Sequence, residues 1–259
     1  MKYYVADAFV DGPFTGNPAG VCIMDSYPDD AVLQNIACEN NLSETAFLVK
    51  TGDAAYNLRW FTTVSEVDLC GHATLASSFV IMNYLEPEAQ ALTFASQSGI
   101  LRCKRSGELY ALDFPSRMPV PAEITPIMEE AVGAKVLEAH KSRDLVLLLD
   151  SEETVRNLNP SMELLLQIKG FLGVCVTAKG DTADFVSRFF TPAEGIPEDP
   201  VTGSAHSNLI PFWAKRLNKA EMTARQLSRR GGWLYVKDMG ERVEIEGRAR
   251  LYLSGEIFY

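Results

Sequence analysis

An internal repeat constrains the fold of this chain more than any other feature of its 259 residues. The segment RWFT at 59–62 recurs as RFFT at 188–191, and CGHA at 70–73 corresponds to VTGSA at 201–205. The copies lie nearly half a chain length apart, and the second copy is three residues longer between these two motifs. Such a period indicates two similar structural halves rather than one continuous core.

The two halves are predicted at residues 1–118 and 119–259, and each combines many short strands with few helices. One segment in each half is apolar almost all round, at 72–85 and at 204–218, which is typical of a buried helix. Pro211 predicts a kink or a local break in the second of these helices. The pattern favours an α+β fold of two pseudo-symmetric halves, each a barrel-like, mostly antiparallel sheet around a central helix. We expect the active site in the cleft between the halves.

Charge and cysteine usage narrow the class of protein. Acidic residues outnumber basic ones, 34 to 24, so we expect neither nucleic acid nor a membrane as a partner. The N-terminal stretch lacks a secretory pattern, and no apolar run is long enough to span a bilayer. The five cysteines are scattered without a CxxC pair, which is typical of a reduced cytoplasmic protein.

Each predicted central helix begins at a repeated glycine motif. A helix N-terminus offers unpaired N–H groups and a partial positive charge, which together bind a carboxylate without lysine or arginine. Small residues at these positions let a ligand approach the backbone, although a tight strand-to-helix turn would also account for the glycines. The candidate substrate-binding residues are Gly71, His72, Ala73, Gly203, Ser204 and Ala205.

The histidines of these helices differ in expected role. His72 and Ser204 occupy corresponding positions of the repeat, so both are suited to hydrogen-bond a ligand, while a capping role would explain His72 equally well. His206 lies two residues further along, and we expect it to be structural. These histidines, Cys70 and Asp199 are ligand types that zinc accepts, but they lack dense spacing, so no metal site is predicted.

Two acids stand outside ordinary helix patterns. Asp199 precedes Pro200, which disfavours helical geometry, and it lies in the stretch that lengthens the second copy. Asn41 and Glu44 have the spacing of a capping box, yet TAFLVK after them reads as a strand. A carboxylate at the start of a strand between apolar neighbours is suited to general acid/base catalysis, because partial burial raises its pKa. Single acids at strand ends and near helix dipoles are also common without catalysis.

Together these motifs resemble the phenazine-biosynthesis-type isomerase family (PhzF-like), whose fold is that of diaminopimelate epimerase. The resemblance runs almost end to end, and its most specific parts are CGHAT at 70–74 and EDPVTGSAH at 198–206. It implies an isomerase that uses no cofactor, is often a homodimer, and moves a hydrogen and a double bond within a small carboxylic acid.

The resemblance also implies four catalytic positions, all of which are intact in this chain. The family's proton-carrying glutamate falls on Glu44 and its assisting histidine on His72. The family's aspartate and serine fall on Asp199 and Ser204. The helix starts that hold the substrate carboxylate in the family correspond to the two glycine motifs described above.

Related epimerases use two thiols as opposed acid and base. Cys70 occupies the first thiol position, whereas we place the second near Pro200, which cannot titrate. We therefore expect single-glutamate catalysis by Glu44 on a cyclic or amino-substituted carboxylic acid, with no metal.

Two other functions stay open on the sequence alone. One is an amino- or hydroxy-acid epimerase or racemase that pairs Glu44 with His72 or Asp199. The other is a non-catalytic metabolite-binding or interaction protein that keeps the same fold.

Overall fold

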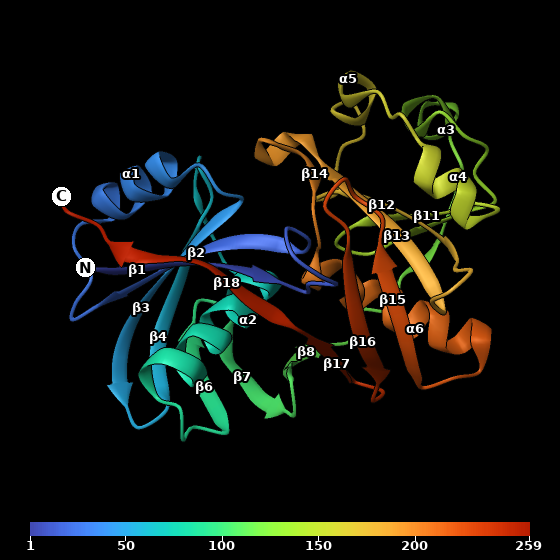
Figure 1. Ribbon diagram of the computed structural model, residues 1–259. Helices are drawn as coiled ribbons and strands as arrows, with labels where there is room; N and C mark the ends of the chain where they lie inside the picture. The colour runs from blue at the N-terminus through green and yellow to red at the C-terminus, as the bar shows by residue number, and fades with distance from the viewer. The chain divides into compact units, whose positions relative to one another are not determined.

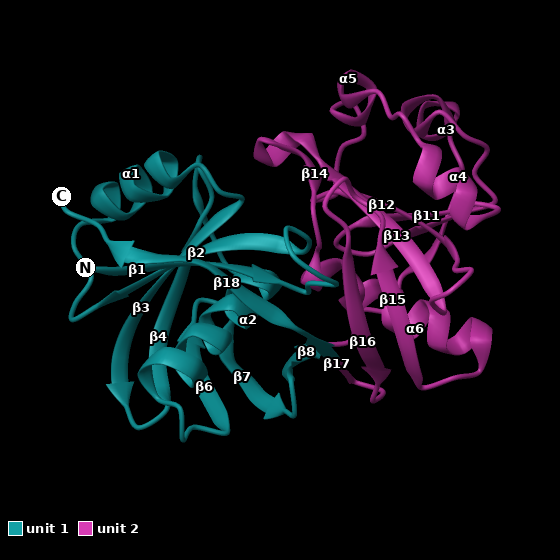
Figure 2. Cartoon of the chain, in the orientation of Figure 1, with its two compact units in different colours: residues 1–114, 245–259 teal, residues 115–244 magenta.

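The computed structural model describes residues 1–259, and Figure 1 traces the chain from its N- to its C-terminus. The chain divides into two compact units, coloured separately in Figure 2. The first comprises Met1–Phe114 with Ile245–Tyr259, and the second comprises Pro115–Glu244. None of the helices combines the length and the apolar character needed to cross a membrane.

The sheet of the first unit has the strand order β18–β1–β2–β3–β4–β6–β7–β8. These strands are β1 Lys2–Ala8, β2 Asn17–Met24, β3 Glu44–Gly52, β4 Ala55–Phe61, β6 Ala91–Ser96, β7 Gly99–Ser106, β8 Leu109–Pro115 and β18 Ala249–Glu256, with the two-residue β5, Glu66–Val67, beside β4. Neighbours are antiparallel except β2 with β3 and β4 with β6. Parallel neighbours need a crossover, and α1, Asp30–Asn40, and α2, Gly71–Val80, supply the two crossovers.

Helix α2 is buried along nearly its whole length, as the apolar sequence predicts. It continues into a π-helical turn at Ile81–Leu85. Its polar residues are satisfied locally, because Ser77 Oγ donates to the Ala73 carbonyl at 2.7 Å and Ser78 Oγ donates to the Thr74 carbonyl at 2.8 Å. These bonds let small hydroxyl residues stand in the core without unpaired donors.

The second unit repeats this plan. Its strands are β9 Val120–Ala122, β10 Glu138–Lys141, β11 Leu145–Leu148, β12 Val174–Lys179, β13 Phe185–Thr191, β14 Ile196–Asp199, β15 Glu221–Gln226 and β16 Gly232–Asp238. The strand β17, Arg242–Gly247, begins in the second unit and ends in the first. Its helices are α3 Pro126–Val132, α4 Glu152–Asn157, α5 Met162–Leu165 and α6 Gly203–Leu217, with a 3-10 turn at Pro192–Glu194. Pro211 lies inside α6, which continues past it without the predicted break.

The connections between parallel strands confirm the predicted repetition. β11 and β12 are parallel and joined through α4 and α5, as β2 and β3 are joined through α1. β13 and β15 are parallel and joined through α6, as β4 and β6 are joined through α2. The predicted α+β class, with one buried helix against the sheet of each unit, is therefore confirmed.

The repeated arginine of RWFT and RFFT makes the same ion pair in both units. Arg59 on β4 binds Glu66 through two hydrogen bonds of 2.7 Å. Arg188 on β13 binds Glu198 on β14 through bonds of 2.7 and 3.0 Å. Each guanidinium also lies 5.1 Å from the ring centre of the phenylalanine two residues on. The arginines therefore give matching reference points for comparing the two units.

The C-terminal segment departs from the expected halves. We expect the second half to extend to the C-terminus, but residues 245–259 belong to the first unit. The physical reason is that β18 pairs antiparallel with β1, so that Lys2 faces Glu256 and Ala8 faces Ala249. A local repeat cannot reveal this long-range pairing.

Candidate active site

The first unit brings four polar side chains together at the starts of a helix and two strands. Asn17 begins β2 and Glu44 begins β3, and the parallel register of these strands puts both starts at one edge of the sheet. Cys70 precedes α2 in an extended conformation, and His72 lies in the first turn of the helix. The edge of the sheet and the helix start therefore present these residues to one another.

The imidazole of His72 is the centre of this cluster. His72 Nε2 lies 3.1 Å from Glu44 Oε2, and Asn17 Nδ2 lies 3.1 Å from His72 Nδ1. Cys70 Sγ lies 3.5 Å from Nδ1. In the neutral ring the Asn17 amide donates to Nδ1, so the ring proton is on Nε2 and faces the Glu44 carboxylate. The Glu44 side chain is 14% exposed and that of His72 is 4% exposed, so solvent reaches the cluster at the glutamate.

Burial and neighbouring charges set the protonation of the cluster. Burial, followed by the charge of Glu44, raises the pKa of the Cys70 thiol to about 11, so it stays protonated near neutral pH. Burial lowers the pKa of His72, but the neighbouring Cys70 and Glu44 side chains raise it, and the net direction is well above its ordinary value. Because the thiol is neutral, we assign the stabilisation of the imidazolium to the Glu44 carboxylate.

The backbone at Gly71–Ala73 forms the first turn of α2. The residue before it, Cys70, makes no side-chain capping bond to the helix. The first intrahelical bond runs from the Thr74 N–H to the Cys70 carbonyl, at 3.2 Å. The N–H groups that precede Thr74 have no helical carbonyl partner, which is the general property that makes such a turn attractive to anions.

In the second unit, Asp199 is held in a network at the end of β14. Thr202 Oγ1 donates to Asp199 Oδ2 at 2.5 Å. Gln226 Nε2 donates to the Asp199 carbonyl at 2.7 Å, and Gln226 Oε1 accepts from the Thr202 N–H at 2.8 Å. Asp199 is only 7% exposed, so these bonds fix a buried acid in one orientation.

Ser204 has a partner that the sequence did not indicate. Arg143 Nη2 donates to Ser204 Oγ at 2.8 Å, and the guanidinium also donates to both carboxylate oxygens of Asp144, at 3.2 and 3.1 Å. Asp144 is fully buried and accepts a further bond from Asn208 Nδ2 at 2.7 Å. Arg143 lies in a turn far from Ser204 in sequence, with no motif around it, so no local signal could have identified the contact.

His206 has the structural role expected for it. Its Nδ1 donates to the Thr202 carbonyl at 2.8 Å, and its ring lies 6.0 Å from that of Phe185. Burial lowers the pKa of His206 to about 4, so the ring is neutral near pH 7.

The start of α6 corrects one detail of the sequence comparison. We placed the second thiol position of the epimerases near Pro200, but the residue that precedes α6 as Cys70 precedes α2 is Thr202. The alignment of CGHA at 70–73 with VTGSA at 201–205 pairs Cys70 with Thr202 as well, so the repeat agrees with the structure at this position. Threonine, like proline, carries no thiol, so this position again offers no second thiol for a two-thiol epimerase.

The residues considered for zinc are distributed over both units. Cys70 and His72 belong to the first unit, and Asp199 and His206 belong to the second. A different set is close together, because ligand atoms of Glu44, Cys70 and His72 all lie within 4.8 Å of one another. These three are the residues in the first unit that could hold a metal ion.

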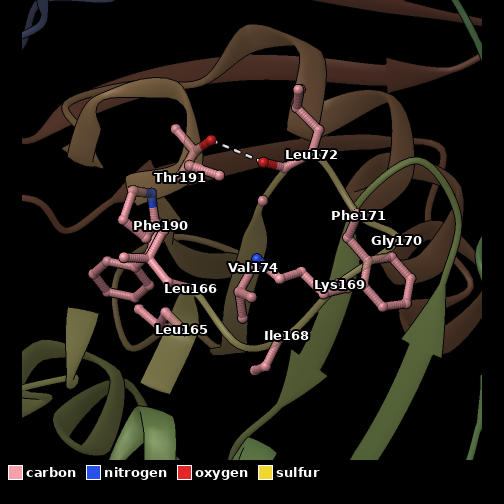
Figure 3. A pocket seen from close by; sticks show the side chains of 13 residues that line it. Leu165, Leu166, Ile168, Lys169, Gly170, Phe171, Leu172, Val174, Phe190 and Thr191 are labelled. Atoms are coloured by element: carbon pink, nitrogen blue, oxygen red, sulfur yellow. Dashed lines mark hydrogen bonds between the residues drawn. The ribbon is translucent and has the colours of Figure 1, made fainter. Parts of the chain in front are cut away.

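An apolar pocket of about 80 Å³ lies elsewhere in the second unit (Figure 3). The residues that line it lie within 165–174 and 190–193, and Thr191 Oγ1 donates to the Leu172 carbonyl between these two segments, at 2.8 Å. None of the candidate catalytic residues lines this pocket.

Comparisons with known proteins agree over the whole chain. The model of the phenazine biosynthesis-like protein family matches residues 6–255. An uncharacterized isomerase of Pseudomonas aeruginosa is 48% identical over 258 residues, which cover 99% of this chain and 98% of that protein. The crystal structure of a phenazine biosynthesis protein of the PhzF family from Enterococcus faecalis matches with a TM-score of 0.96 and 50% identity, covering 100% of this chain and 99% of the other.

A more distant structure extends the comparison of the fold. The hydroxyproline epimerase of Agrobacterium vitis matches with a TM-score of 0.68 at 10% identity, covering 98% of this chain and 91% of the other. This likeness concerns the fold alone and confirms the predicted epimerase-like architecture. By its match over residues 6–255 and its full-length similarity to these relatives, the chain belongs to the phenazine biosynthesis-like protein family.

Proposed function

We propose that this protein is an isomerase that moves a proton and a double bond on a small carboxylic acid, with Glu44 as the general acid/base. The observation that carries the proposal is the pairing of the largely buried Glu44 carboxylate with His72 Nε2 at 3.1 Å. The naming of full-length relatives as isomerases supports the reaction class.

In the proposed reaction one carboxylate both removes and returns the proton. Glu44 takes a proton from a saturated carbon beside a double bond, and the electron pair of that C–H bond becomes the new double bond. The π electron pair of the original double bond moves to its far carbon, and this carbon accepts the proton back from Glu44. No electrons are gained or lost overall, so the step needs no redox cofactor.

His72 has a positioning and electrostatic role in this scheme. Its Nε2 contacts Oε2 of Glu44, which leaves Oε1 for the substrate carbon. Asn17 contacts Nδ1 on the opposite side of the ring and holds its orientation. A proton on Nε2 stabilises the carboxylate form of Glu44 and so favours return of the proton from Glu44 to the substrate.

In this proposal Asp199 and Ser204 bind and polarise the same substrate. Ser204 Oγ accepts from Arg143, so the proton of its own hydroxyl is available to a substrate oxygen. The backbone N–H groups of Gly71–Ala73 and Gly203–Ala205 hold the substrate carboxylate. The family resemblance further leads us to propose a homodimer, which light scattering would test against the chain mass of 28.6 kDa.

Two observations favour this chemistry over two-thiol epimerisation. The Cys70 thiol stays protonated, because burial and Glu44 raise its pKa to about 11. The corresponding residue before α6 is Thr202, which carries no thiol. An opposed pair of thiols is therefore not available to these positions.

The test is to incubate unsaturated cyclic and amino-substituted carboxylic acids with the protein in deuterated water and follow them by NMR. We expect deuterium in the product together with a shifted double bond. Deuterium at a single stereocentre without movement of the double bond would instead indicate an epimerase or racemase. Tight binding without turnover across the panel would indicate a binding protein.

A variant pair assigns the base once a substrate is found. Glu44→Gln should remain folded and bind the carboxylate but lose deuterium exchange. Glu39→Gln, on the exposed end of α1, is the matched control and should exchange at the wild-type rate. Retained exchange in Glu44→Gln would contradict the assignment.

A further inference from the structure

We propose that Glu44, Cys70 and His72 form a binding site for a thiophilic divalent cation such as Zn²⁺, and that the bound ion blocks the isomerase. The inference rests on the positions and chemistry of three side chains in the first unit. The binding itself does not depend on the proposed reaction.

The ligand atoms are nearly placed for a tetrahedral ion. His72 Nε2 lies 3.1 Å from Glu44 Oε2 and 4.0 Å from Cys70 Sγ, and the three atoms all fall within 4.8 Å of one another. A tetrahedral zinc ion bound through sulfur, nitrogen and oxygen holds those atoms about 3.4–3.6 Å apart, given ordinary zinc–ligand distances. Cys70 Sγ lies closer to Nδ1, at 3.5 Å, than to Nε2, so closing the site requires the Cys70 side chain to rotate toward Nε2.

The surroundings provide what a zinc site needs beyond its ligands. With Nε2 on the metal, Nδ1 carries a proton and faces the Asn17 amide, which can rotate to accept it. Cys70 and His72 are almost fully buried, whereas the Glu44 side chain is 14% exposed. The open side at Glu44 is the route of entry and the place for a fourth ligand, such as water.

The donor set determines which cations the site accepts. One thiolate, one imidazole and one carboxylate favour Zn²⁺, Co²⁺ and Cd²⁺ over Mg²⁺, which prefers oxygen ligands in octahedral geometry. Binding displaces the thiol proton from Cys70 and the Nε2 proton from the imidazolium of His72, and no bond to carbon changes. Because Glu44 and His72 become metal ligands, neither can take part in proton transfer while the ion is bound.

The second unit offers no equivalent site. Thr202 and Ser204 take the positions of Cys70 and His72 at the start of α6, and neither is a good zinc ligand. We therefore expect one ion per chain from this type of site.

Cobalt absorption tests the proposal without relying on activity. The full-length protein, stripped with EDTA and dialysed, is titrated with Co²⁺ while absorbance is recorded. We expect one equivalent to give visible bands of tetrahedral cobalt and a near-ultraviolet thiolate-to-cobalt band, both removed by Zn²⁺ and unaffected by excess Mg²⁺. The absence of a thiolate band in the wild-type protein would overturn the proposal.

Two variants and a control locate the ligands. Cys70→Ser should lose the thiolate band and bind Zn²⁺ at least about 100-fold more weakly. Glu44→Gln should keep the thiolate-to-cobalt band but bind Zn²⁺ more weakly. This second variant tests the site independently if Cys70→Ser fails to fold. Cys38→Ser removes an exposed cysteine of α1 and should leave spectrum and affinity unchanged. A thiolate band that persists in Cys70→Ser, or disappears in Cys38→Ser, would overturn the assignment.

The regulatory part has its own test. Zn²⁺ should abolish deuterium exchange into a substrate, and EDTA should restore it fully. Loss of exchange after EDTA treatment alone would show that the ion is required, and would overturn inhibition as its effect.

Discussion

The two units share a scaffold but differ at the place where the first carries Glu44. Arg59 faces Phe47 on β3, and Glu44 lies three residues before Phe47. Arg188 faces Val176 on β12, and Gly173 lies three residues before Val176, so Gly173 takes the position of Glu44. A Cβ atom at Gly173 would lie 2.4 Å from the Phe189 ring, so the second unit has no room there for any side chain. Its aromatic packing occupies the space that the first unit leaves to a carboxylate.

The starts of the two buried helices also carry different side chains. Cys70 and His72 in the first unit correspond to Thr202 and Ser204 in the second. Helix starts, strand order and arginine ion pairs are common to both units, while the titratable groups beside the helix start are not. The comparison teaches that a duplicated fold can keep two similar helix starts while only the first unit places a glutamate and a histidine together beside one of them.

The largest predicted effect on kcat/KM comes from replacing His72 of the first unit with serine, the residue at the corresponding position of the second unit. His72→Ser should lower kcat/KM by about 10²–10⁴-fold, the range typical of a lost acid/base partner. Ser204→Ala should lower it only about tenfold, because it removes one neutral hydrogen bond. Both values are measured on the substrate found by the NMR screen. Equal losses in the two variants would mean that the units contribute alike.

The second prediction contrasts the histidines of the two buried helices. The folded-state pKa of His206 is about 4, below the ordinary value of 6.5, so the unfolded chain binds its proton first as the pH falls. The stability contributed by neutral His206 is complete above pH 6.5 and declines toward pH 4, by about 3 kcal/mol in total.

Urea unfolding at several pH values between 4 and 7 measures this contribution. His206→Phe removes the titrating group, so its free energy of unfolding should depend less steeply on pH than that of the wild type. If the two pH profiles are parallel, His206 is not the group responsible.

The third prediction concerns the space at Gly173. Gly173→Ala should lower the free energy of unfolding by about 1–3 kcal/mol, because the added methyl group meets both the Phe189 ring and the Phe190 carbonyl. Gly52→Ala is the control on β3, where the nearest atom to a new Cβ is 3.8 Å away, and it should change stability by less than about 0.5 kcal/mol. Chemical denaturation compares the two. An unchanged Gly173→Ala protein would show that a side chain fits in the second unit after all.

The smallest predicted effect should be the same in both units. Arg59→Lys and Arg188→Lys each remove a two-point ion pair with a glutamate, and each should cost about 1 kcal/mol. Their midpoints of urea unfolding, measured side by side, should shift together. A large shift in Arg188→Lys alone would contradict equal effects and point to the bonds that Arg188 donates to the Val155 and Leu158 carbonyls, which Arg59 lacks.

The sequence predicted those parts of the molecule that depend on local pattern. The repeat indicated two similar units, the apolar runs indicated the buried helices, and the strand signal after Glu44 placed that residue at the start of β3. The roles of the four candidate catalytic residues stay predictions, to be tested by the experiments above.

The features that the sequence did not predict depend on contacts between distant segments. The bond from Arg143 to Ser204 and the contact of Asn17 with His72 join residues that no motif connects. Side-chain partners of this kind follow from packing in three dimensions rather than from spacing along the chain.

The return of β18 to the first unit has a consequence for synthesis on the ribosome. β1 lies between β18 and β2, and the Met1 amino group donates to the Ile257 carbonyl at 2.9 Å. Until β18 emerges from the ribosome, β1 is an uncovered edge strand with unpaired backbone groups. We therefore expect the second unit, although later in the sequence, to complete its strand pairing before the first, which must wait for the synthesis of β18.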